Sequence, residues 1–228
     1  METYDPAQRD ALYQSFLTTP GERGSVDYKA SVELKSGDRF SLRLFRHIIG
    51  MANSGGGWIV IGYKEDKRQG FVPDPSHTNA ICQSYDTTKL SKGVNSLLRT
   101  GTETLNVYVN QTKHPNNNLT YPIIQVEGFT KSPFFTKGDP KADDKGQLTI
   151  SPGVLYVRRP GAETVALSDP SDWERLIDLC MQLRRDEFLR QLEDLLNRMG
   201  LRVTVSAPTI ISSDVWMDEM RRRAIGQK

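Results

Sequence analysis

Three consecutive glycines between a helix pattern and a buried-strand pattern constrain the fold of this chain most strongly. They stand in residues 52–66, ANSGGGWIVIGYKED. Upstream, residues 41–53 have the apolar periodicity of an amphipathic helix. The apolar residues at helical spacing are Phe45, Ile48, Ile49 and Ala52. Downstream, residues 58–61 are continuously apolar, as in a strand buried on both faces. The glycines therefore join a helix to a strand.

This order of elements argues against a phosphate-binding glycine loop. Such loops follow a strand and precede a helix, so that the free N–H groups of the helix meet the phosphate. Here the helix comes first, and neither Gly-Lys-Ser nor Gly-Lys-Thr follows the glycines. We interpret them as positions that permit positive φ angles and close backbone packing.

Composition favours one globular domain with an appendage, since the chain has 228 residues, 37% hydrophobic and 25% charged. The formal net charge of +2 is too small to identify an acidic partner. Cys82 and Cys180 are far apart and form neither a disulfide framework nor a CxxC pair. The first ten residues lack the apolar core of a signal peptide, and no apolar run approaches the ~18 residues of a membrane span. We expect a cytoplasmic protein with no membrane partner.

Periodicity divides the chain into four parts. It predicts an N-terminal helix in residues 1–20, a core in residues 21–170, C-terminal helices in residues 171–200 and an interaction tail in residues 201–228. The expected strands of the core are residues 26–34, 58–63, 105–112, 120–129 and 153–159, with a second core helix over 87–98. Strands interspersed with helices indicate an α+β fold.

The C-terminal helices carry two apolar stripes. The first includes Trp173, Leu176, Ile177, Cys180 and Leu183, and the second includes Phe188, Leu192, Leu195 and Met199. Arg184, Arg185 and Asp186 interrupt the register between them. Either both stripes pack on the sheet, or the second docks against another subunit. The second alternative predicts a homodimer or a helper protein bound through these helices.

Several fragments between Glu22 and the first C-terminal helix carry a family resemblance. In order they are ERGSVDYK, FRHIIGMANSGGGWIVIGYKED, QGF, YPIIQVEG, SPFF and GVLYVRRPGAETVALSDPSDWERL. Together, over about residues 20–180, they resemble the Schlafen AlbA-like domain family. The resemblance implies an α+β fold in which a mixed β-sheet is packed with helices. It also implies nucleic acid as the partner, RNA more than DNA, because several members are endoribonucleases that cut structured RNA such as tRNA with three carboxylates.

Carried onto this sequence, the resemblance places the first acid on Glu22, the second on Asp27 and the third on Glu65 or Asp66. The family commonly has Glu where Asp27 stands. Carboxylates that hold Mg²⁺ or Mn²⁺ suit phosphodiester cleavage, which predicts metal binding by Glu22, Asp27 and Glu65. Lys29 shares a strand face with Asp27 and would orient a water or meet the phosphate. Alternatively, these acids only support turns, and Asp27 and Lys29 form an exposed ion pair.

Four arginines are candidate nucleic-acid contacts: Arg158, Arg159, Arg43 and Arg46. Arg158 matches the family's YxR pattern. No histidine is assigned a role in catalysis or metal binding: His47 lies roughly opposite the apolar face of its helix, and His77 and His114 lie in loops without metal-ligand spacing. The sequence therefore predicts a divalent-metal-dependent endoribonuclease acting on structured RNA. The alternative is a non-catalytic DNA- or RNA-binding regulatory module, or a subunit of a larger complex.

Overall fold

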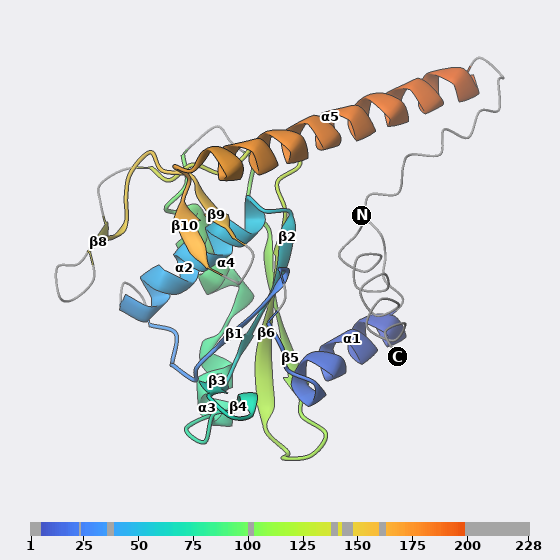
Figure 1. The fold of residues 1–228 in the computed structure, drawn as a ribbon. Helices are drawn as coiled ribbons and strands as arrows, with labels where there is room; N and C mark the ends of the chain where they lie inside the picture. Colours follow the sequence, from blue (N-terminus) through green and yellow to red (C-terminus); the bar gives the residue numbers. More distant parts are fainter. Residues whose placement is uncertain are drawn as a thin grey trace. The chain divides into compact units, whose positions relative to one another are not determined.

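The computed structural model describes residues 6–22, 24–35, 39–99, 103–137, 141–142, 148–159 and 163–198. The chain forms two compact units, Met1–Trp173 and Glu174–Lys228. The first unit contains the predicted α+β fold, and Figure 1 shows its sheet and helices.

The first unit is built on a mixed four-stranded sheet with strand order β1-β2-β6-β5. These strands are β1 (Val26–Lys29), β2 (Gly56–Ile61), β5 (Val107–Lys113) and β6 (Thr120–Glu127). β1 and β2 are parallel, with Asp27 opposite Ile59, and the other two pairings are antiparallel. β1 is therefore an edge strand of this sheet, and the helix that precedes β2 connects β1 to its parallel neighbour.

Helices α1 (Pro6–Thr18) and α2 (Arg39–Ala52) lie on opposite faces of this sheet, as Figure 1 shows. On one face, Tyr28 belongs to an apolar cluster with Phe16 of α1, and its hydroxyl donates to the Phe16 carbonyl at 2.9 Å. Because side chains alternate along a strand, the neighbouring Asp27 points to the other face. There Ile48 and Ile49 of α2 are fully buried.

The glycines lie where α2 is followed by β2, as predicted, and the second and third of them begin the strand. Gly55 and Gly56 have φ angles of 98° and 92°, in the left-handed region that favours glycine. A Cβ atom on Gly56 would also lie 2.7 Å from the Val126 carbonyl oxygen of β6. Glycine is therefore needed at this joint both for backbone conformation and for close approach between strands.

Smaller elements complete the first unit. They are the hairpin β3 (Tyr63–Asp66) and β4 (Gly70–Pro73), the helices α3 (Asn79–Ser84) and α4 (Thr87–Asn95), the pair β7 (Lys141–Ala142) and β8 (Leu148–Ile150), and the pair β9 (Tyr156–Arg158) and β10 (Thr164–Ala166). β9 and β10 pack on α2 so closely that a Cβ on Gly50 would lie 2.5 Å from Thr164 Cγ2. This contact covers α2 beside His47, whose Nδ1 lies 2.9 Å from Thr164 Oγ1.

Helix α5 (Pro170–Arg198) is continuous, although the sequence suggested an interruption at residues 184–186. Arginine and aspartate shift the apolar stripe without ending the helix, because neither breaks a helix as proline does. Met181 and Phe188 are 66% and 63% exposed. Met199 and the predicted tail lie outside the described residues. Among the described helices, none is long and apolar enough to cross a membrane.

Candidate functional site

The site centres on Asp27, a fully buried carboxylate on β1. Lys29 Nζ lies 3.0 Å from its Oδ1 and 2.8 Å from its Oδ2, and Arg158 Nη1 lies 3.2 Å from Oδ2. Burial alone would raise the pKa of Asp27, but the charges of Lys29 and Arg158 offset this effect and lower the pKa. Asp27 is therefore a carboxylate held between two cations.

Arg158 holds β9 against the start of β1. Its Nε donates to the Gly24 carbonyl at 3.2 Å and its Nη2 to the Val26 carbonyl at 3.3 Å. Its backbone N–H donates to Ser54 Oγ at 2.8 Å, which ties the same residue to the glycine joint. With its side chain 1% exposed, Arg158 is not on the surface where the sequence predicted a phosphate contact.

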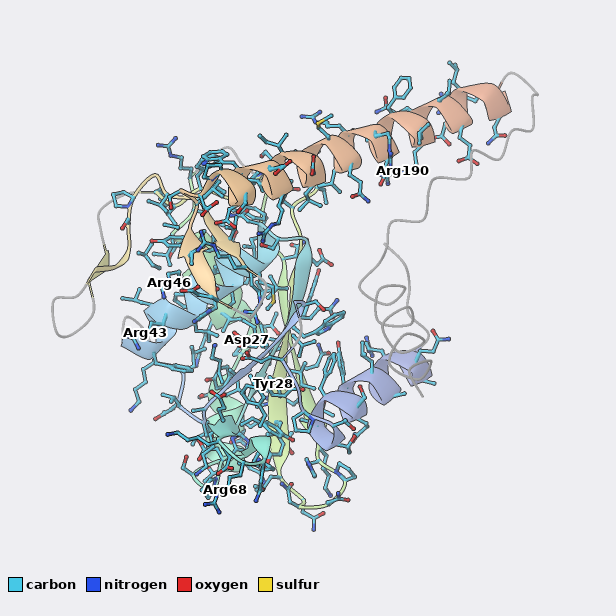
Figure 2. All side chains as sticks on the ribbon, in the orientation of Figure 1. Asp27, Tyr28, Arg43, Arg46, Arg68 and Arg190 are labelled. Atoms are coloured by element: carbon cyan, nitrogen blue, oxygen red, sulfur yellow. The ribbon has the colours of Figure 1, made fainter. Side chains whose placement is uncertain are left out.

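Helix α2 brings three basic side chains to this region, and Figure 2 labels Arg43, Arg46 and Asp27. His47 Nδ1 lies 4.0 Å from Asp27 Oδ2 and 2.9 Å from Thr164 Oγ1. Burial and the nearby Lys29 lower the pKa of His47 to about 3, so the ring is neutral at pH 7. Arg43, one turn earlier, is exposed, and the half-buried Arg46 lies 6.0 Å from the centroid of the Tyr156 ring.

Glu22 comes together with Asp27, as the first two predicted acids would have to do in a shared site. Partial burial, a hydrogen bond with Asp27 and the charge of Asp27 raise the pKa of Glu22 to about 7. Lys29 and Arg158 act in the opposite direction. At neutral pH the Glu22 carboxyl therefore carries only part of a negative charge.

The third predicted acid does not join this pair. Glu65 stands opposite Phe71 in the β3–β4 hairpin, and Phe71 stacks on Tyr28 with ring centroids 5.0 Å apart. Tyr28 lies on the sheet face opposite to Asp27, so Glu65 is on the wrong side to share a ligand with it.

Asp66 supports the turn of the same hairpin. Its Oδ1 accepts hydrogen bonds from the backbone N–H groups of Arg68 and Gln69, which lower its pKa. Figure 2 shows Arg68 at the tip of the hairpin, well apart from Asp27.

The described side chains around Asp27 are not arranged as a preformed divalent-metal site. Within the described ranges, no group of three or more His, Cys, Asp or Glu side chains is placed to hold one. Both oxygens of Asp27 face Lys29, and one also faces Arg158, so a metal ion would compete with two cations. Binding of Mg²⁺ or Mn²⁺ by Glu22, Asp27 and Glu65 stays a prediction.

Arg159 is engaged at the start of α5. Its Nε donates to Asp172 Oδ2 at 2.8 Å, and its Nη2 lies 2.6 Å from the same oxygen and 3.6 Å from Asp169 Oδ2. Like Arg158, it is held by protein carboxylates. Of the four predicted arginine contacts, only Arg43 is exposed without such an ion pair among the described residues.

Sequence reasoning missed two residues that hold the site in place. Ser54 accepts a hydrogen bond from the Arg158 backbone, and Thr164 hydrogen-bonds to the His47 ring. Only Asp27 gave a usable signal, because it stands between Val26 and Tyr28 in a strand. An acid between two apolar residues of a strand indicates a buried carboxylate, and such a group requires a cationic partner. Nothing in the sequence identified Arg158 as that partner.

Comparison with known proteins identified a protein family and similar solved structures. The family model described as "Schlafen, AlbA_2" matches residues 22–165. Among solved structures, the chain is similar to a solution NMR structure, the N-terminal domain of a putative ATP-dependent DNA helicase RecG-related protein from Nitrosomonas europaea. That match has 14% identity and a TM-score of 0.35, and covers 62% of this chain and 90% of the other. The comparison with curated proteins gave no match.

Proposed function

The chain belongs to the Schlafen AlbA_2 family, which suggests binding or processing of nucleic acid, and we propose that it binds nucleic acid through Lys29 and the exposed face of α2. RNA is the expected partner rather than DNA. The binding surface consists of Lys29 and Arg43, with Arg46 beside them.

The observation that carries this proposal is the charge of the Arg158–Asp27–Lys29 group. Two cations face one carboxylate, so the group has a net charge of +1, and both Asp27 and Arg158 are buried. Lys29, with its side chain 25% exposed, is the end of the group that solvent reaches. A lysine held in place by a buried carboxylate is suited to contact a phosphate without losing much side-chain entropy on binding.

Helix α2 extends this positive charge. Its sequence, RFSLRLFRHIIGMA, contains three arginines and no acidic residue. Because His47 lies over Asp27, Arg43 one turn earlier continues the same helix face away from Asp27. The raised pKa of Glu22, about 7, reduces the negative charge that this second acid adds near Lys29 and Asp27. These features favour attraction of a phosphate backbone.

Reversing the charge of one arginine tests whether nucleic acid binds at this surface or is attracted only by the overall charge of the protein. Arg43→Glu and the matched control Arg190→Glu change the charge equally, and Figure 2 labels both residues. Fluorescence anisotropy with labelled single-stranded RNA, single-stranded DNA and duplex RNA at 50–200 mM salt measures affinity. We expect Arg43→Glu to weaken binding to all sequences and to reduce the salt slope by about 0.7 on single strands. An affinity of Arg43→Glu equal to that of Arg190→Glu would contradict the proposed surface.

Metal-dependent cleavage of structured RNA such as tRNA is a second candidate, favoured by the approach of Glu22 to Asp27. Incubation of tRNA with the protein in Mg²⁺, Mn²⁺ or EDTA tests it. Discrete fragments in Mg²⁺ or Mn²⁺, lost in EDTA and in Glu22→Gln, would support cleavage. Binding without fragments under all three conditions would leave the nucleic-acid-binding module.

A further inference from the structure

A serine hydroxyl and a histidine ring nitrogen meet outside the site described above. Ser31 Oγ lies 2.6 Å from His77 Nδ1. Ser31 follows β1 and is half-buried, whereas His77 lies between β4 and α3 and is 4% exposed. The residues are 46 positions apart in sequence, so no local motif pairs them.

The hydrogen bonds of the imidazole determine which nitrogen carries its proton. His77 Nε2 lies 2.8 Å from the Thr120 carbonyl oxygen, which can only accept a hydrogen bond. In the neutral ring Nε2 must therefore carry the proton, and Nδ1 presents a lone pair to Ser31. The Ser31 hydroxyl donates to that lone pair, which is the direction needed for removal of its proton.

Both partners are held in this position by their surroundings. The His77 ring stacks on Tyr121 with centroids 4.3 Å apart and an interplanar angle of 14°. Gly62 leaves room for the ring, because a Cβ there would lie 2.9 Å from Nδ1. The Ser31 backbone N–H donates to Asp74 Oδ2 at 3.0 Å. A nucleophile, a base and a group that orients the base are thus arranged together.

We propose that Ser31 is a nucleophile activated by His77 toward neutral carboxylic esters. Between acyl and phosphoryl substrates we choose the neutral ester, because the Asp74 carboxylate, which accepts a hydrogen bond from the Ser31 backbone N–H, would repel an anionic phosphodiester. Hydrogen bonds from Ser31 and Ser76 outweigh the effect of partial burial and lower the pKa of Asp74, so it is ionised at pH 7. This activity is independent of the proposed nucleic-acid surface.

The reaction has two balanced steps. Ser31 Oγ attacks the ester carbonyl carbon while its proton passes to His77 Nδ1. The bond from the carbonyl carbon to the alkoxy oxygen breaks, and the leaving alcohol takes that proton from His77. In the second step His77 accepts a proton from water as the water attacks the acyl-serine, and Ser31 regains a proton as the acid leaves. The sum is ester plus water giving acid plus alcohol.

The test uses p-nitrophenyl acetate, a neutral ester, with the full chain. Nitrophenolate release is followed by absorbance, and peptide mass mapping locates the acetyl group. We expect acetylation of Ser31 in the wild-type chain, none at this position in Ser31→Ala, and at least about a hundredfold slower acylation in His77→Gln. Ser76→Ala is the matched control, because its hydroxyl donates to Asp74 rather than to a histidine.

Two outcomes would overturn the proposal: absence of acetyl-Ser31, or equal acylation rates in wild type and a folded His77→Gln. Since His77 is buried, circular dichroism must first show that its variant folds. If it does not, Ser31→Cys provides a second measurement. An activating His77 should make that thiol react with iodoacetamide at least about tenfold faster than Cys180, and an equal rate would refute activation.

Discussion

Replacing Arg158 with methionine tests whether this arginine is a buried structural cation or a nucleic-acid contact. The substitution removes the Asp27 ion pair at 3.2 Å and the hydrogen bonds to the Gly24 and Val26 carbonyls. Removing one partner of a buried pair leaves an uncompensated charge and costs about 3–5 kcal/mol. Lys29 still faces Asp27, so we expect the lower end of this range, about 3 kcal/mol.

Urea denaturation of purified protein gives the change in unfolding free energy. For a chain of this size, about 3 kcal/mol corresponds to a fall in Tm of about 6–12 °C. Arg43→Met is the control, since substitution of this exposed arginine should change stability by no more than about 0.5 kcal/mol.

A double variant distinguishes the buried charge from simple loss of packing. Asp27→Asn combined with Arg158→Met removes both charges, so we expect it to be more stable than Arg158→Met alone. If the free energy of unfolding of Arg158→Met is within about 1 kcal/mol of the wild-type value, the guanidinium does not compensate the charge of Asp27 and our account of the site is wrong.

Two further predictions concern pH and assembly. The folded-state pKa of Glu22 is raised from 4.5 to about 7, so its contribution to stability is present below pH 4.5 and is lost as pH rises through 7. Urea denaturation at pH 5 and pH 8 should show a smaller pH-dependent loss in Glu22→Gln, and identical pH dependence in both proteins would contradict this coupling. If the exposed stripe of α5 forms a homodimer, light scattering should give a dimer mass for the wild type and a monomer mass for Phe188→Glu combined with Leu195→Glu. A wild-type monomer would remove the homodimer and leave the helper protein as the prediction.

The parts of the fold that followed from sequence are those set by local patterns. The glycine joint was predictable because helix periodicity ends and a continuous apolar run begins within four residues of Gly55. The pairing of β5 with β6 was predictable from two strand patterns around a polar loop. β1 proved shorter than expected, since residues 30–34 form no strand pairing.

The candidate site depended on contacts that local patterns do not encode. Arg158 has the same charge as Arg159, yet one lies buried against Asp27 and the other binds Asp172. The directions of these two side chains are set by how β9 packs on α2 and β1. Likewise, Glu65 stands in the position expected of a third acid, but hairpin register places it with Phe71. A sequence can show that an acid is present without showing which face of the sheet it occupies.

The bond between Asp27 and Arg158 also has a consequence for the order of folding. The arginine hydrogen-bonds to carbonyls beside Asp27 that precede it by 134 and 132 residues. During synthesis β1 is made early, but its buried carboxylate cannot meet this cation until β9 has left the ribosome. β1 should therefore dock stably only late in synthesis, since its long-range contacts close a large loop. A chain released before β9 would leave the buried Asp27 with Lys29 but without Arg158, and this less stable chain would be a ready substrate for cellular proteases.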